Sequence, residues 1–288
     1  MTALTSRPPA SDAATLRALA WIEARRYARH PLFLIGVALL AVVSAATADD
    51  RGTWGGNEIG PAFFLGVLGV FVGFGLTRSV QRAGEAVESA PADGVLRTAA
   101  LCLACLVPVA AALVWLVLQF WAFQVWPATD GWYPAVSSAT VLAVLLGGVV
   151  AAAGGPLVGV LVGRWTRFPG AGLLTAVALV GWVLLSTFGL GMRPSRWATL
   201  VELNAPLAQW ASSDLASDDP RWLAAGSPWW HLAYISVLCG AAATAAMLHD
   251  AVGGRRTTRL LRVLAVLAVA AAACLGLAVA PDPVRIPL

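Results

Sequence analysis

Few residues in this sequence are of types that could carry catalytic or metal chemistry, and their spacing favours no site. All 19 basic residues are arginine, so a P-loop and a lysine Schiff base, which both need lysine, are excluded. Cys102 and Cys105 share a helix face, but no second Cys or His pair at metal-ligand spacing accompanies them. They lie in apolar stretches, as do Cys239 and Cys274, where a thiol behaves as a small hydrophobic side chain. We therefore expect no catalytic residue, no metal site and no cofactor on this chain.

Charged and histidine side chains also avoid the middle of the apolar stretches. His231 and His249 mark the two ends of one stretch, and His30 precedes another, so each is expected at an interface rather than in a ligand set. No Asp, Glu or Arg lies near the centre of any stretch. Ion-coupled transporters usually hold their ion with an intramembrane carboxylate or a broken helix, and intramembrane hydrolases need a nucleophile with its base, or a metal. Both classes are disfavoured.

The elements that must position these residues are membrane spans. Of 288 residues, 59% are hydrophobic and 12% are charged, and the mean hydropathy is +0.77. A soluble globule cannot bury that much apolar surface. The pattern predicts an all-α polytopic membrane protein with seven transmembrane helices, at 31–48, 61–77, 98–119, 138–163, 170–190, 229–249 and 260–280.

The distribution of arginine predicts the orientation of these helices. Fourteen of the 19 arginines fall on the side that includes the N-terminus, and five fall on the other side. By the positive-inside rule we expect the N-terminus to be cytoplasmic, and seven spans then place the C-terminus outside. The membrane is expected to be a bacterial plasma membrane. Most of the tryptophans fall near the predicted outer boundaries, where amphipathic rings prefer to lie.

Two cytoplasmic segments have patterns of their own. Residues 12–29 combine apolar side chains with four arginines, and predict an amphipathic helix that lies along the inner interface and ends before Pro31. The loop 78–97 has mixed charge and predicts a short helix, from about Gln81 to Ser89, that presents Arg82, Glu85 and Glu88 to the cytosol. Pro91 then begins a turn into the next span.

Outside the membrane, the loop 191–228 is too long to be a slack linker and predicts an outer cap. Ser195 is expected to cap a helix that runs towards Trp210, and a second helix is expected to begin near Pro220. Within the spans, Pro108 and Pro156 should kink a helix or interrupt its hydrogen bonds. Glycines at helix-packing spacing fit either packing within one bundle or a dimer interface: Gly69, Gly73, Gly155, Gly159 and Gly163.

Taken together, these segments resemble the type-2 membrane permeases of ATP-binding-cassette (ABC) exporters, particularly actinobacterial members. The resemblance covers residues 12–249. Its N-terminal part, which includes Glu23, Arg25-Arg26 and Arg29-His30-Pro31, resembles the interfacial elbow helix of such permeases. The acidic stretch Glu85 to Pro91 resembles their coupling segment between spans two and three. The Gly-Thr and paired leucines common in that segment are missing here, and the seventh span goes beyond the six-span core.

The resemblance implies a transmembrane permease subunit of an ATP-driven exporter that has no ATPase site of its own. Its partners would be a cytosolic ABC ATPase, which uses ATP and Mg, a second copy or a related permease, and membrane lipid, with no nucleic acid. The implied domains are an N-terminal tail and elbow helix (1–30), a six-span core with the outer cap (31–249), and a basic loop, seventh span and outer tail (250–288). The implied ATPase-coupling residues are Arg82, Glu85, Glu88, Pro91, Glu23 and Arg26.

Two other classes stay open from the sequence. One is a non-transporting membrane subunit, such as an assembly or sensor protein whose outer cap binds a partner. The other, less favoured, is a secondary transporter. The sequence names no substrate, because an apolar path suits a lipid, a peptide or a drug equally.

Overall fold

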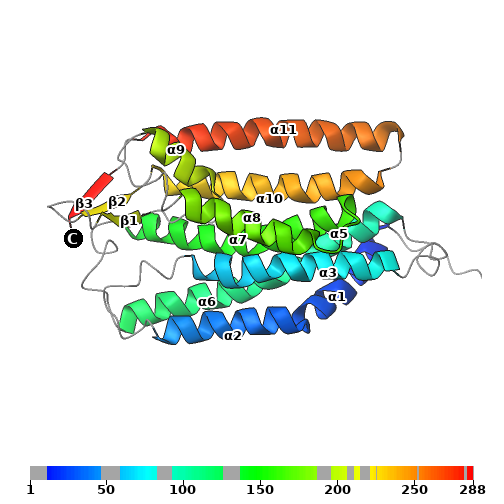
Figure 1. Cartoon of the computed structure of the whole chain (residues 1–288), viewed down its shortest axis with the longest axis horizontal. Coiled ribbons are helices and arrows are strands. Elements are labelled where there is room, and N and C mark those ends of the chain that lie inside the picture. The colour runs from blue at the N-terminus through cyan, green and yellow to red at the C-terminus, as the bar shows by residue number, and fades with distance from the viewer. Residues whose placement is uncertain are drawn as a thin grey trace, which may run out of the picture.

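The structure, a computed structural model, is a bundle of long helices (Figure 1). It describes residues 12–46, 59–82, 93–125, 137–186, 196–205, 211–214, 221–224, 226–251, 253–281 and 284–287. Its helices are α1 (Asp12–Ala28), α2 (Pro31–Ala46), the π-helix η2 (Pro61–Val67), α3 (Leu68–Arg82), α5 (Gly94–Ala104), α6 (Leu106–Val125), α7 (Ser138–Trp165), α8 (Ala171–Leu184), α9 (Arg196–Asn204), α10 (Pro228–Asp250) and α11 (Gly254–Val279). Each of the seven apolar stretches predicted from the sequence falls on a helix over the residues that the structure describes.

Length and hydropathy decide which of these helices can cross a membrane. Five described spans qualify: η2 with α3, α5 with α6, α7, α10 and α11. There are six if α1 and α2, which bend by 59° at the break between them, are counted as one more. Helix α8, with 14 residues, is shorter than a full span. The multi-span helical architecture is therefore confirmed, whereas the count of seven membrane crossings stays a prediction.

Local sequence explains where several helices begin and break. The side chain of Asp93 accepts a hydrogen bond from the Val95 amide and caps α5, and Ser137 caps α7 in the same way. Proline starts α10 at its first position. Between α5 and α6 the helix breaks at Cys105, because Pro108 has no N–H to bond the carbonyl four residues earlier. The interruption predicted at Pro108 is confirmed, whereas α7 is a continuous helix through Pro156.

Helix α7 is the centre of the bundle and packs against η2, α3 and α10. The predicted glycines make this close approach possible. A Cβ atom on Gly155 would lie 1.8 Å from the carbonyl oxygen of Gly66, and one on Gly73 would lie 2.2 Å from that of Pro156. These glycines therefore pack within one chain, as the first of the two sequence interpretations has it.

One end of the bundle carries a small antiparallel sheet that the sequence analysis did not predict. Strands β1 (Ala211–Asp214) and β2 (Arg221–Ala224) come from the outer cap, and β3 (Val284–Pro287) comes from the C-terminal tail and pairs with β2. The predicted helix after Ser195 exists as α9 but ends at Asn204, and the helix predicted near Pro220 is wrong, because a strand begins there. The tail and the cap therefore lie at the same end of the bundle (Figure 1). This is expected, because α10 leads away from that end and α11 leads back to it.

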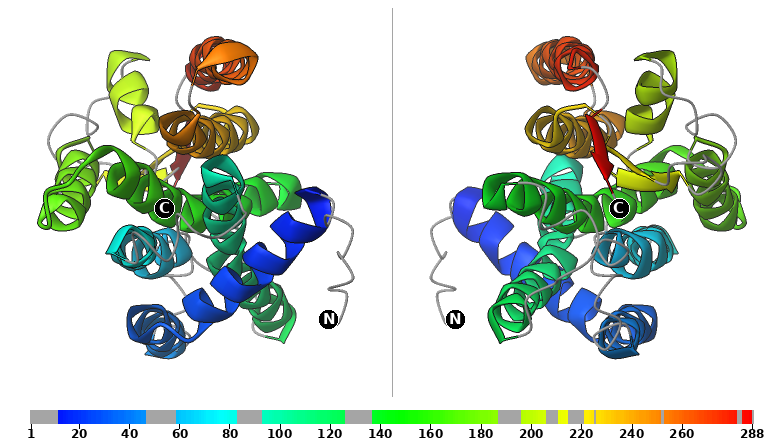
Figure 2. Two further views of the ribbon diagram at one scale, coloured as in Figure 1. Left: turned by 90° about the vertical axis from the view of Figure 1, so that its right-hand side faces the viewer. Right: turned by 90° about the vertical axis from the view of Figure 1, so that its left-hand side faces the viewer.

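The opposite end of the bundle is crossed by α1. Figure 2 shows α1 running diagonally across part of this end, where it packs against α5 and contacts α2, α3 and α6. Tyr27 near its C-terminal end is buried, whereas Trp21 and Ile22 are exposed, and the Arg25 guanidinium lies 5.4 Å from the Trp21 ring centroid. A helix with this split between a buried and an aromatic, cationic face is suited to a membrane surface.

Candidate functional site

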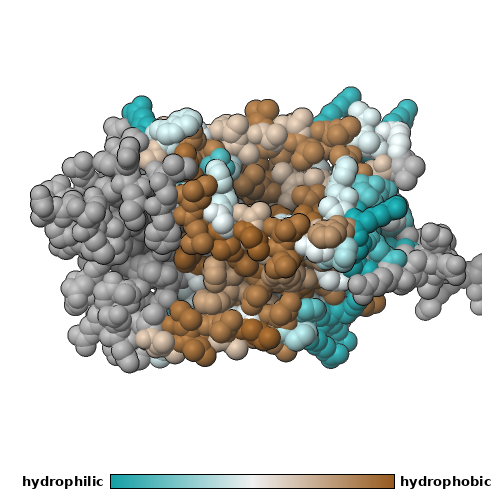
Figure 3. All heavy atoms as spheres, viewed as in Figure 1, coloured by the Kyte–Doolittle hydropathy of each residue, from teal (hydrophilic) through white to brown (hydrophobic). Residues whose placement is uncertain are grey.

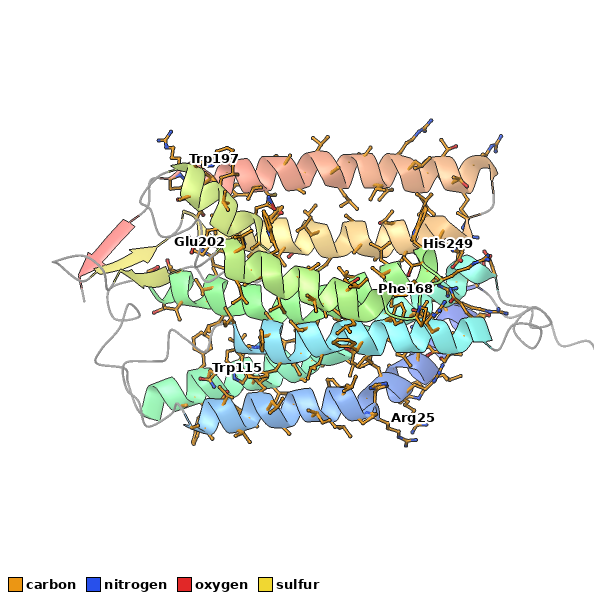
Figure 4. All side chains as sticks on the ribbon, in the orientation of Figure 1. Arg25, Trp115, Phe168, Trp197, Glu202 and His249 are labelled. Atoms are coloured by element: carbon orange, nitrogen blue, oxygen red, sulfur yellow. The ribbon has the colours of Figure 1, made fainter. Side chains whose placement is uncertain are left out.

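Polar and charged side chains gather at the end of the bundle that α1 crosses, which we call the arginine-rich end. Figure 3 shows this end as hydrophilic beside a broad hydrophobic band, and Figure 4 places Arg25 and His249 there. It is formed by α1, the C-terminal ends of α3, α7 and α10, and the N-terminal ends of α5 and α11. Its described arginines include Arg25, Arg26, Arg29, Arg78, Arg97, Arg164, Arg167, Arg255 and Arg256.

Two of the sequence-predicted coupling residues, Glu23 and Arg26, lie at this end and contact each other. The Arg26 guanidinium lies 2.9 Å from the Glu23 carboxylate, and its other nitrogen donates a 2.7 Å hydrogen bond to the hydroxyl of Ser79 on α3. Arg26 therefore links α1 to the C-terminal end of α3, because Ser79 lies three residues before Arg82. Glu85, Glu88 and Pro91 lie outside the described residues, and of Arg82 only the backbone, the last residue of α3, is described.

The helices on both sides of the segment 83–92 are anchored to their neighbours. Before it, Arg78 donates a 2.5 Å hydrogen bond to the Arg167 carbonyl, and Gln81 donates a 3.0 Å bond to the Gly163 carbonyl. After it, Asp93 caps α5 and pairs with Arg256 at the start of α11. The predicted coupling segment thus enters and leaves the bundle at two fixed points on the arginine-rich end.

A buried polar cluster, which we call the Asp250 cluster, lies next to these anchors. Asp250 at the end of α10 accepts a hydrogen bond from the hydroxyl of Thr98, lies 3.6 Å from the Arg164 guanidinium and contacts the His249 ring at 3.0 Å. The Arg164 and Asp250 side chains are 9% and 13% exposed. Two Arg164 nitrogens, Nε and Nη2, are buried without a hydrogen-bond partner among the described residues. Because a buried charge is costly without its counterion, Asp250 holds α5, α7 and α10 together.

The Asp250 cluster was not predicted from the sequence, where Arg164 counts only among the arginines of the predicted cytoplasmic side. The available signal was that each charged residue sits at the end of an apolar helix on the same predicted side, where opposite charges on neighbouring helices tend to pair.

A second buried polar group lies at the other end, in the segment 191–228 that the sequence predicts as the outer cap. Glu202 on α9 is 6% exposed, and burial raises the pKa of its carboxyl from an ordinary value of 4.5 to about 8. Nearby, the Tyr234 hydroxyl donates to the Asn204 carbonyl at 3.3 Å, and the Tyr234 ring stacks on that of His231 at 6.2 Å. Figure 4 shows Glu202 at the end opposite His249.

The raised pKa of Glu202 predicts that the outer cap loses stability in alkaline solution. Between pH 4.5 and about 8 the folded chain holds a proton that the unfolded chain has released, so the free energy of unfolding falls as the pH rises through this window. Near pH 4.5, Glu202→Gln should melt at the same temperature as the wild type. At pH 9 it should melt at a higher temperature, because its free energy of unfolding should exceed that of the wild type by a few kcal/mol. Melting curves across this range test the difference, with Glu23→Gln as the control. Parallel curves for the wild type and Glu202→Gln would contradict it.

The described contacts at the arginine-rich end link its helices to one another. Among the described residues no group of three or more His, Cys, Asp or Glu side chains is placed to hold a metal ion. The four cysteines are free, and Cys105 is buried with its thiol directed to the Leu101 carbonyl. What the arginine-rich end offers is a charged surface whose helices are linked by ion pairs and hydrogen bonds.

Comparison with known proteins adds no family to this description. No protein-family model matches the chain, and the searches of curated proteins and of solved structures found no match. The fold defines a class: a multi-pass helical membrane protein with several long apolar helices.

Proposed function

We propose that this chain is the transmembrane permease subunit of an ABC exporter and that a separate cytosolic ATPase docks on its arginine-rich end. In this proposal the chain lies in a bacterial plasma membrane with its N-terminus inside and its C-terminus outside. It dimerises with a second copy or a related permease.

One observation carries the proposal: the helices on both sides of segment 83–92 are fixed, and α1 is tied to one of them. A force applied to this segment would be passed to α3 and α7 through Arg78 and Gln81, and to α5 and α11 through Asp93. The Arg26–Ser79 hydrogen bond would pass it to α1 and, across the 59° bend, to α2. A subunit driven by an external ATPase needs such a connection between its docking segment and its spans.

Charge supports the same surface as the docking site. The described helices on both sides of segment 83–92 carry arginines, Arg78 on α3 and Arg97 on α5, and the sequence of the segment itself contains Glu85 and Glu88. A mixed surface of this kind can form charge-assisted hydrogen bonds with a soluble partner and can steer its approach.

The experiment that tests the proposal is purification of the tagged chain from its native membrane. We expect an ABC ATPase to co-purify, and we expect ATP hydrolysis by the complex but not by the isolated chain, which contains no lysine for a P-loop. ATP hydrolysis by the isolated chain would overturn the proposal. A stable partner without an ATPase site would favour the assembly or sensor alternative.

Charge reversal tests the docking segment itself. The double variant Glu85→Arg with Glu88→Arg should weaken binding of the ATPase by about 3 kcal/mol, roughly a hundredfold in Kd, because two or three charge-assisted contacts become repulsive. The matched control is Asp218→Arg with Asp219→Arg, the same change of charge in the outer cap. The control should bind normally, and both variants should insert normally. Undiminished binding of the first variant would place the contact elsewhere.

A further inference from the structure

An apolar cavity of about 270 Å³ lies halfway along the bundle, between η2, α7, α8 and α10. Its floor is formed by Gly66 of η2 with Ala151, Gly154 and Gly155 of α7. Leu179 of α8 and the α10 residues Leu238, Cys239 and Ala242 form its sides. These side residues are only half-buried, so the cavity opens sideways between α8 and α10.

The backbone around the cavity is unusual as well. Gly66 belongs to the π-helix, a conformation that is rare and often occurs at functional sites. Gly66 and Gly155 pack backbone against backbone at one edge of the cavity, whereas Gly154 leaves the space beside α7 open. A Cβ atom on Gly154 would meet only the Cys239 sulfur, at 3.6 Å, so a longer side chain there would extend into the cavity.

The position of the cavity decides what can enter it. Residues 151–158 of α7 and 235–242 of α10 are the middle of helices long and apolar enough to span a membrane. The opening therefore faces the hydrocarbon core, where neither water nor a polar solute is available. Apolar cavities stay dry, and one of about 150 Å³ already binds a benzene ring.

We propose that this cavity binds a single acyl chain of a bilayer lipid, which enters laterally between α8 and α10. Its depth excludes the lipid headgroup, so recognition rests on shape and apolar contact with Leu179, Ile235 and Leu238. The site does not depend on an ATPase partner. It would exist whether the chain is a permease or a structural subunit.

The test uses the purified chain in nanodiscs that contain phosphatidylglycerol with a photoactivatable diazirine in the middle of its acyl chain. After irradiation we expect crosslinks, located by mass spectrometry, on the Gly154–Gly155 and Leu238–Ala242 peptides. Crosslinks to Val266 and Val269 on the exposed face of α11 serve as the internal reference for bulk lipid.

Two variants fill the cavity: Gly154→Leu and Ala242→Leu. Each should lower the cavity crosslinks several-fold relative to the α11 reference. The matched control is Gly147→Leu on the same helix, where a Cβ atom meets nothing within 4 Å, and its cavity crosslinks should equal those of the wild type.

Two outcomes would overturn the proposal. One is wild-type protein that crosslinks on α11 but not on the cavity peptides, a result that does not require any variant to fold. The other is cavity crosslinking that persists undiminished in both filling variants.

Discussion

Gly155→Ala is expected to lower the free energy of unfolding by about 3 kcal/mol, although it adds a single methyl group. That methyl would lie 1.8 Å from the Gly66 carbonyl oxygen and 2.5 Å from its carbon, so the backbones of α7 and η2 must move apart. The next glycine along α7, Gly159, is packed as closely, because a Cβ atom there would lie 2.2 Å from the Val70 carbonyl oxygen. A separation of the helices at Gly155 would therefore loosen this contact too. Thermal unfolding of the detergent-solubilised protein measures the loss.

The matched control for this change is Gly147→Ala on the same helix. No heavy atom lies within 4 Å of a Cβ atom at Gly147, and alanine is favoured over glycine in a helix by about 1 kcal/mol. This variant should therefore be as stable as the wild type or more stable. Equal melting temperatures for the two variants would show that the α7–η2 crossing is not as tight as the structure has it.

A second large effect is expected at Asp250. Asp250→Ala leaves the buried Arg164 guanidinium without its carboxylate partner, and the loss of one member of a buried ion pair costs about 3–5 kcal/mol. Replacement of both members, Arg164→Met with Asp250→Leu, should recover most of this loss, because no unpaired charge is left behind. Unfolding measurements on the two single variants and the double variant give the coupling energy between the residues.

The exposed ion pair at the same end is the control for Asp250. Arg256 and Asp93 have side chains that are 51% and 43% exposed, and such pairs contribute less than about 1 kcal/mol. Arg256→Ala removes this pair and leaves the capping of α5 by Asp93 intact. If Arg256→Ala lowered the free energy of unfolding as much as Asp250→Ala does, burial would not be the reason for the large effect at Asp250.

Much of the fold follows from the sequence because the relevant signals are local. A run of apolar side chains long enough to cross a bilayer predicts a helix by itself, and the described residues of all seven such runs are helical. The break before α6 follows from Pro108 for the same reason. Helix α5 begins at Gly94, four residues before the predicted span, because Asp93 caps it there. The outer sheet could not be predicted in this way, because β2 forms beside a tail strand some 60 residues away. Local turn and capping residues near Pro220 therefore suggested a helix.

The candidate sites also differ in whether they depend on local sequence or on contacts between distant segments. Glu23 and Arg26 were named through the resemblance, which rests on a local amphipathic segment, and in the structure Arg26 pairs with Glu23 and contacts Ser79 near the end of α3. The Asp250 cluster joins residues from three helices, and the cavity depends on how η2, α7, α8 and α10 are arranged. Neither is present in any one stretch of sequence.

The pairing of β3 with β2 sets an order of events during synthesis. Strand β3 follows α11 in the chain, so α11 must be in place before β3 can reach the cap. The three-stranded sheet can therefore close only after β3 has been synthesised, while the helices before it have had time to assemble. A stalled or truncated chain that lacks the last residues would carry a complete central bundle beneath an unfinished cap, with the edge of β2 exposed to pair with another chain.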